Sequence, residues 1–199
     1  MSHSRTHYPN DELGSVNDAA VAAVVETFDV IVEVPLGEKV KYELEMEGCH
    51  AGRARVDRIL SCAMSYPGNY GFVPGTLAED GDATDVLIVN DLPIQTGAVL
   101  KCRAIGLLEM EDEKGRDDKL IAMPSSTVDP RYNAVRCTAD LHDSVRAKIV
   151  HFFEQYKMID APARWSKVGA CLGPEEAQEM LSRHRRAHRL DRNAEETGV

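Results

Sequence analysis

The chain has 199 residues, 43% of them hydrophobic and 28% charged, a composition typical of one ordinary globular domain. Its 33 acidic residues against 23 lysines and arginines leave a net charge of −10, which disfavours a nucleic-acid partner because such a protein needs a broadly basic face. No run approaches the ~20 apolar residues of a membrane helix, so we expect no membrane partner. Divalent cations are a more natural partner for an acidic chain.

The cysteines indicate a reducing compartment. The chain has five of them, an odd and scattered set without the spacing of a zinc site, and several lie within apolar runs. The first residues lack a basic start followed by an apolar core, so no secretory signal is expected. The sequence therefore predicts a cytoplasmic protein.

Hydrophobic alternation predicts the elements of the first two thirds. Residues 1–27 are expected to be a polar extension, with a short helix over 19–25. A period of two then predicts strands over 28–34 and 40–46, which we expect to form a hairpin around Gly37. The polar face of this hairpin carries three charged residues, Glu33, Lys41 and Glu43. Further strands, separated by Gly and Pro, are expected over 53–60, 85–90, 98–110 and 119–123.

The last third has the pattern of helices. Apolar residues at helical spacing predict one helix across Val145, Ile149, Phe152, Phe153 and Tyr156. A second helix is expected to begin at Pro174 and to end near Leu190, followed by a tail over 191–199. Many short strands followed by helices predict a single α+β domain over 28–190, with its strands in a small barrel or sandwich.

The most informative segment holds three aspartates, Asp80, Asp82 and Asp85, within six residues and directly before a hydrophobic strand. Carboxylates so close together repel one another unless water solvates them or they share a cation. An EF-hand loop starting at Asp80 would need Gly at its sixth position and Glu at its twelfth, whereas this chain has Asp85 and Asp91 there. The segment is therefore an acidic turn of another kind.

A second acidic cluster occupies residues 111–118, at the expected tip between two strands. Such a tip is often charged only because it is solvated, but here Lys119 follows the acids directly. Two acidic loops together with Glu33 and Glu43 would suit a magnesium site that also holds substrate phosphates. Arg58 has the strand phase of Ala54 and Val56, where an apolar residue is expected, and this favours a functional role over an arginine at a strand end that reaches water. Lys41 could equally form a cross-strand ion pair, and core residues with solvated hydroxyls are the more ordinary interpretation of Tyr66, Tyr70 and Tyr156. None of these residues decides the function alone.

Taken together and in order, these segments resemble the soluble, magnesium-dependent inorganic pyrophosphatases. The resemblance covers about residues 28–168 and rests on several motifs in register rather than on one short pattern. The motifs are Lys41-Tyr42-Glu43-Leu44, Val56-Asp57-Arg58, Tyr66-Pro67-Gly68-Asn69-Tyr70-Gly71-Phe72, Asp80-Gly81-Asp82 with Asp85, the hairpin with Asp112 and Asp117, Lys119, and His151-Phe152-Phe153-Glu154-Gln155-Tyr156-Lys157.

The resemblance implies a five-stranded OB-type β-barrel flanked by C-terminal helices. It implies an enzyme that hydrolyses pyrophosphate to two phosphates with a metal-activated water, without a covalent intermediate, using several Mg²⁺ ions. It also implies a homo-oligomer, either a dimer or a hexamer.

The resemblance also assigns roles to individual residues. The implied metal ligands are Asp80, Asp85, Asp112, Asp117 and Glu33. Asp82 is implied to accept a proton from the attacking water, with Tyr70 beside it. The implied phosphate-binding residues are Lys41, Arg58, Lys119, Tyr156 and Lys157, and Glu43 and Tyr66 are implied to line the cavity.

One departure concerns the triple-aspartate turn. The family commonly has Pro and then an apolar residue after the middle aspartate, where this chain has Ala83 and Thr84. Alanine restricts the backbone less than proline, so we expect this turn to be less stiff than in the family. Three other functions remain open at this point: a non-catalytic scaffold, a single-strand nucleic-acid module, and a hydrolase of nucleotides or longer polyphosphates.

Overall fold

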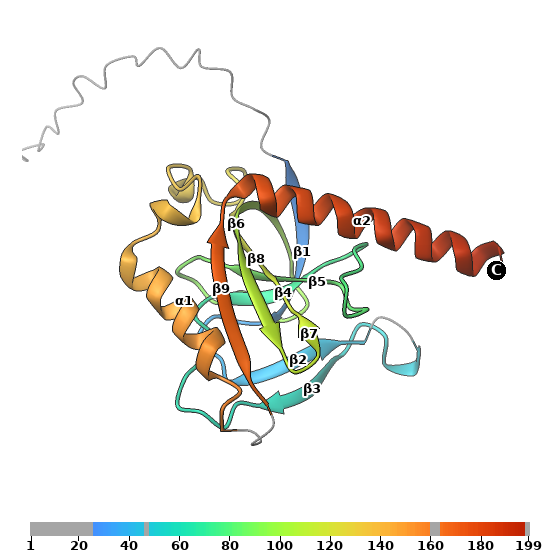
Figure 1. The fold of residues 1–199 in the computed structure, drawn as a ribbon, viewed down its shortest axis with the longest axis horizontal. Helices are drawn as coiled ribbons and strands as arrows, with labels where there is room; N and C mark the ends of the chain where they lie inside the picture. Colours follow the sequence, from blue (N-terminus) through green and yellow to red (C-terminus); the bar gives the residue numbers. More distant parts are fainter. Residues whose placement is uncertain (1–25, 46–47, 160–163, 198–199) are drawn as a thin grey trace, which may run out of the picture.

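The computed structural model describes residues 26–45, 48–159 and 164–197 (Figure 1). The short helix expected over 19–25 lies outside these residues. The strands are β1 (Thr27–Val34), β2 (Val40–Leu44), β3 (Ala54–Ile59), β4 (Asn69–Val73), β5 (Thr84–Ile88), β6 (Val99–Asp112), β7 (Gly115–Arg116), β8 (Lys119–Pro124) and β9 (Ser166–Leu172). The helices are α1 (Asp143–Gln155) and α2 (Pro174–Thr197).

Five strands close into a barrel in the order β1-β4-β5-β8-β6, with β6 pairing back to β1. The pairing of β5 with β8 is parallel, and the other pairings around the barrel are antiparallel. The strands β7 and β9 extend the sheet from β6, and β2 and β3 form a separate two-stranded sheet. The predicted five-stranded barrel with two C-terminal helices is thus confirmed.

The hairpin predicted between β1 and β2 is wrong, because the two strands belong to different sheets. β1 pairs with β4 and β6, whereas β2 pairs with β3. The segment that links β1 to β2 is held by a more distant part of the chain. The backbone N–H of Gly37 donates to the carbonyl of Tyr66, and the N–H of Tyr66 donates to the carbonyl of Glu38. The donor–acceptor distance is 3.0 Å in both hydrogen bonds.

Side-chain alternation divides the core into two clusters. One, here called the interior cluster, takes residues from all five barrel strands, and α2 covers it with Ala177, Met180 and Leu181. The other, the α1-side cluster, packs the opposite strand face against Phe152 and Phe153 of α1. Successive residues of a strand point to opposite faces, so each barrel strand contributes to both clusters. This division decides which polar residues meet at the site.

β4 was not predicted as a strand, since Pro67, Gly68 and Gly71 are typical of turns. The structure shows what Gly71 contributes instead. A Cβ atom at this position would lie 2.0 Å from the carbonyl oxygen of Ile31 in β1. Only glycine permits so close a contact between β1 and β4, so the residue is needed within the barrel wall.

α2 is longer than predicted and continues past Leu190 to Thr197. Figure 1 shows its first turns against the barrel and its C-terminal half projecting beyond it. No helix in the described ranges is both long and apolar enough to span a membrane.

Candidate active site

Three barrel strands carry the charged residues at the centre of the site. Along β5 and β8, Val86 and Leu120 are paired and belong to the interior cluster, so the preceding Asp85 and Lys119 both face the α1 side. Asp112 ends β6 in the same phase as Met110, a residue of the α1-side cluster. Strand alternation therefore brings an aspartate, a lysine and a second aspartate to one face.

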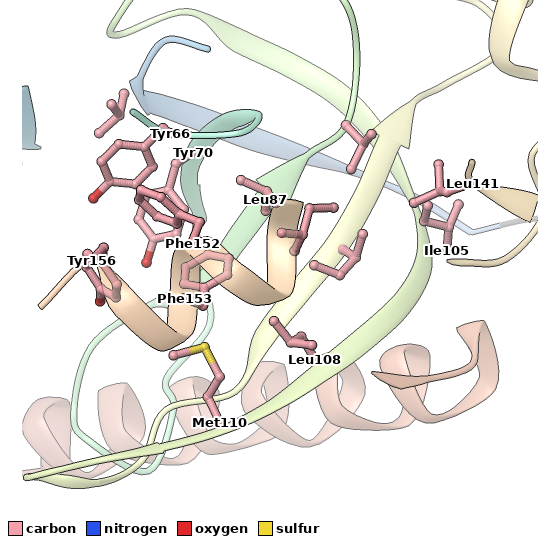
Figure 2. Packing of buried hydrophobic residues seen from close by; sticks show 14 of the residues in the cluster. Tyr66, Tyr70, Leu87, Ile105, Leu108, Met110, Leu141, Phe152, Phe153 and Tyr156 are labelled. Atoms are coloured by element: carbon pink, nitrogen blue, oxygen red, sulfur yellow. The ribbon is translucent and has the colours of Figure 1, made fainter. Parts of the chain in front are cut away.

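Three tyrosines extend the α1-side cluster towards these charges. Tyr66 and Tyr70 lie with ring centroids 5.3 Å apart, and Tyr156, which follows α1, stacks on Phe152 at 5.0 Å. Figure 2 shows their three hydroxyl oxygens at the same end of the cluster. Burial raises the pKa of each phenol, so all three stay protonated at neutral pH. They can therefore donate hydrogen bonds to an anion.

One pocket collects most of the predicted site residues. It is lined by Lys41, Arg58, Tyr66, Tyr70, Asp80, Asp82, Asp85, Asp112, Glu113, Lys114, Arg116, Asp117, Lys119, Phe153, Tyr156, Lys157 and Arg164. Twelve of the predicted residues are in this set. Two are outside it: Glu33 lies beneath β2, and the exposed carboxylate of Glu43 pairs with Lys41 at 3.0 Å.

Two lysines hold the carboxylates at the floor of this pocket. Lys119 is only 2% exposed and donates to the carboxylates of both Asp85 and Asp117. Lys157, two residues beyond the end of α1, is 6% exposed and donates to Asp112. Charge-assisted hydrogen bonds of this kind are stronger than neutral ones. Each lysine is thus fixed in place and offers its charge to the pocket.

The carboxylates differ in their affinity for protons. Burial, with the neighbouring charges of Asp80 and Asp85, raises the pKa of Asp82. Burial also raises the pKa of Asp117 despite its contact with Lys119. At Asp112 burial acts in the same direction, but the hydrogen bonds from Lys157 and from the N–H of Lys114, together with the charges of the nearby lysines, outweigh it and lower the pKa. Of the two aspartates with a raised pKa, Asp117 is bound by the Lys119 ammonium group and Asp82 is not. Asp82 is therefore the better proton acceptor.

Sequence reasoning missed five pocket residues as functional candidates: Glu113, Lys114, Arg116, Phe153 and Arg164. Three of them belong to the loop between β6 and β8, which was considered only for its acids. A signal was present there, because Lys114 and Arg116 alternate with the acidic residues of that loop. Arg164 follows a segment with no strong pattern and could not have been singled out by spacing.

The donor set suits a divalent cation. Five aspartates line one pocket, and carboxylate oxygens are the ligands that Mg²⁺ and similar hard cations prefer. In the part of the chain that is described, no three Asp, Glu, His or Cys side chains converge as a ready coordination shell. The ammonium of Lys119 lies between Asp85 and Asp117 instead. The carboxylates fit the charge and chemistry of such ions. In this structure Lys119 and Lys157 provide the positive charge beside them.

Glu33 lies beside the pocket, and its properties give a testable pH dependence. Its side chain accepts a hydrogen bond from the N–H of Leu44 at 3.2 Å and is 7% exposed. Burial raises the pKa of Glu33 from 4.5 to about 7, against the lowering effect of the Leu44 hydrogen bond. The folded protein therefore holds this proton more tightly than the unfolded chain does.

We expect the metal-free protein to lose stability relative to Glu33→Gln as the pH rises from about 4.5 to about 7. In this window the unfolded chain releases the proton while the folded protein still binds it, so the free energy of unfolding falls by on the order of 3 kcal/mol. Glutamine keeps the acceptor for Leu44 but carries no titrating proton. Urea unfolding of both proteins across this range measures the difference, and parallel curves would contradict the assignment.

The fold and the pocket together define a class of protein, a hydrolase that acts on an anionic phosphate compound with the help of divalent cations. The family model described as inorganic pyrophosphatase matches residues 30–189. The chain belongs to the inorganic pyrophosphatase family and is a diphosphatase, an enzyme that hydrolyses pyrophosphate to phosphate with a divalent metal cofactor.

Curated relatives and solved structures agree with this assignment. The inorganic pyrophosphatase of Campylobacter jejuni is 41% identical over 163 residues, covering 82% of this chain and 92% of its own. That of Bradyrhizobium diazoefficiens is 46% identical over 159 residues, covering 79% of this chain and 87% of its own. The structure of the Helicobacter pylori inorganic pyrophosphatase superposes with a TM-score of 0.79 at 41% identity, over 83% of this chain and 95% of the other.

Proposed function

We propose that the enzyme works by direct attack of water on pyrophosphate, with several Mg²⁺ ions as its cofactor and no covalent intermediate. The observation that supports this most is the arrangement of opposite charges in one pocket. Aspartates that suit cations lie beside buried lysines that suit phosphate, and Lys119 and Lys157 are hydrogen-bonded to those aspartates. We infer that the aspartates Asp80, Asp85, Asp112 and Asp117 hold the metal, with Glu33 beside them.

When bound, divalent cations lower the pKa of a water molecule and neutralise charge on the phosphates. Asp82 takes the proton from the attacking water, for which its raised pKa suits it. The new bond forms between this water oxygen and one phosphorus, and the bond from that phosphorus to the bridging oxygen breaks. Tyr70 of β4 lines the same pocket as Asp82, and its hydroxyl group can orient the nucleophile there.

The leaving phosphate carries away the electron pair of the broken bond. Its charge is stabilised by the cationic side chains Lys41, Arg58, Lys119 and Lys157, and the Tyr156 hydroxyl adds a neutral donor. Lys41 is held from the other side by Glu43 and by Asp57, at 3.0 Å and 3.3 Å. These contacts restrict its side chain before substrate binds, so less conformational entropy is lost on binding.

The proposal is tested by phosphate release from pyrophosphate before and after removal of metal. We expect chelation to abolish release and excess Mg²⁺ to restore it. Mg²⁺ alone, without substrate, should also raise the free energy of unfolding, by about 2.7 kcal/mol at a concentration of 100 times its Kd. Release that continues at the same rate in the metal-free enzyme would contradict the proposal.

The assembly and the location of the enzyme stay predictions. A homo-oligomer is supported by large apolar side chains that are exposed on the described surface, among them Val56, Ile59 and Val99. The cytoplasmic location rests on the cysteine usage given above.

A further inference from the structure

A buried polar network joins α2 to the acidic turn. His184 of α2 is 4% exposed, and both of its ring nitrogens have partners. Its Nδ1 lies 2.9 Å from Oγ1 of Thr84, and its Nε2 lies 3.1 Å from Oε2 of Glu79. Glu79 and Thr84 lie on either side of the segment that carries Asp80 and Asp82, and Asp85 directly follows Thr84. None of the roles given above uses this network.

The direction of each hydrogen bond follows from its partners. Burial lowers the pKa of His184, so the ring is neutral and has one N–H. The Glu79 carboxylate can only accept, so Nε2 donates to it and Nδ1 accepts from the Thr84 hydroxyl. The N–H of Thr84 donates to Oγ1 of Thr76 at 2.9 Å, and the Thr76 hydroxyl donates to the carbonyl of Val73. The buried hydroxyl groups of Thr76 and Thr84 and both ring nitrogens of His184 thus all have hydrogen-bond partners.

Local hydrogen bonds hold the first half of the turn, where the N–H of Gly81 donates to the carbonyl of Ala78 and the N–H of Asp82 donates to Oδ1 of Asp80. The N–H of Ala78 donates to the carbonyl of Asp82 at 2.8 Å, and the N–H of Leu77 donates to the carbonyl of His184 at 3.1 Å. Among the described residues, the N–H of Ala83 makes no hydrogen bond. Alanine at this place also leaves the backbone freer than proline would. The Thr84 hydroxyl therefore adds a side-chain contact to the backbone contacts of Thr84 with Val73 and Thr76, at the point where the turn enters β5.

We propose that His184 is a positioning residue, which fixes the acidic turn through its hydrogen bond to Thr84 so that the aspartates are spaced to bind divalent cations. The proposal rests on the proposed function, since it takes Asp80 and Asp85 to be metal ligands. α2 thereby has two roles: its apolar face covers the interior cluster, and His184 contacts the turn that leads into β5.

The sharpest test removes the hydroxyl group of Thr84 without changing the shape of its side chain. We expect Thr84→Val to weaken Mg²⁺ binding ~10-fold or more, the usual effect of removing a group that orients metal ligands. Isothermal titration of the substrate-free protein with MgCl₂ measures the Kd directly. His184→Gln, which can keep the contact with Glu79 but not the one with Thr84, should weaken binding as much.

Two further variants serve as controls. His184→Asn places an amide near the position of Nδ1, keeps an acceptor for Thr84, and should bind Mg²⁺ nearly as well as the parent. His188→Asn makes the same substitution one turn along α2, at a residue whose side chain makes no hydrogen bond or ion pair in the described part of the chain, and should change nothing. The double variant Thr84→Val/His184→Gln should lose no more affinity than either single one, because both remove the same contact.

Thermal unfolding without metal separates positioning from a loss of folding. A merely structural role would lower the unfolding midpoint and leave the Kd for Mg²⁺ unchanged in the folded protein, and this would overturn the proposal. An unchanged Kd for Thr84→Val in a parent that binds Mg²⁺ would overturn it too, while leaving the proposed function intact. A parent that binds no Mg²⁺ would overturn both.

A second substitution, Ala83→Pro, tests whether Thr84 acts by restraining the backbone of the turn. Ala83 has no hydrogen-bonded N–H to lose, and proline would stiffen the turn independently of His184. We expect Thr84→Val to weaken Mg²⁺ binding less in this background than in the parent. An equal loss in both would show that Thr84 does not act by restraining the turn.

Discussion

Asp82→Asn should lower kcat at least ~100-fold, the usual contribution of a general base. Asparagine keeps the shape of the side chain and removes its affinity for a proton. The fold does not depend on this carboxylate, because the backbone of Asp82 is held by its own N–H, which donates to Asp80, and by its carbonyl, which accepts from Ala78. The variant should therefore fold normally, and phosphate release from pyrophosphate at saturating Mg²⁺ measures the loss.

A matched control for this variant is Asp191→Asn, which makes the same substitution at an exposed residue near the end of α2. It should keep full activity. If Asp82→Asn also kept full activity, the enzyme would need another proton acceptor, and Asp82 would be only one of the acidic residues of the turn.

The largest effect on stability is expected from Lys119→Met. This lysine is almost fully buried and is shared between Asp85 and Asp117, so its removal leaves two carboxylates facing each other without a counter-ion. Breaking a buried ion pair in this way costs about 3–5 kcal/mol. Urea unfolding of the metal-free protein at neutral pH measures the change in the free energy of unfolding.

The control here is Lys101→Met, since Lys101 pairs with Asp29 at 3.1 Å and the two side chains are half exposed. Loss of an exposed pair should cost no more than about 1 kcal/mol. Mg²⁺ should restore part of the stability of Lys119→Met, because cations replace the missing positive charge, but should not do so for Lys101→Met. Equal stability of the two variants without metal would contradict the role given to Lys119.

Strands with a clear period of two could be predicted from the sequence, and their partners could not. β1, with Val30, Val32 and Val34 fully buried, is such a strand, yet its expected pairing with β2 was wrong. Neighbouring strands with a glycine between them are typical of a hairpin, and the contacts of that linker with Tyr66 lie outside any local pattern. β9 was not predicted, because Gly169 and its mostly exposed residues interrupt the alternation.

The site was predicted through the resemblance more than through spacing. Composition and the triple-aspartate turn indicated a metal site, and the motifs in register added the lysines and tyrosines. That Lys119 would be shared between Asp85 and Asp117 depends on the parallel register of β5 and β8, which the sequence does not reveal. The network of His184 was equally hidden, since its partners lie about a hundred positions earlier in the chain.

The contacts of the two buried lysines also have a consequence for folding. Lys119 meets Asp85 across 34 positions of sequence, and Lys157 meets Asp112 across 45. Loops of this length must close before either contact can form, and closure of such non-local pairings is slow. A fragment over residues 84–157 would hold both pairs, but it would lack β1 and β4, which complete the barrel. We therefore expect the catalytic pocket to form late in folding, and activity to appear only in chains whose barrel has closed.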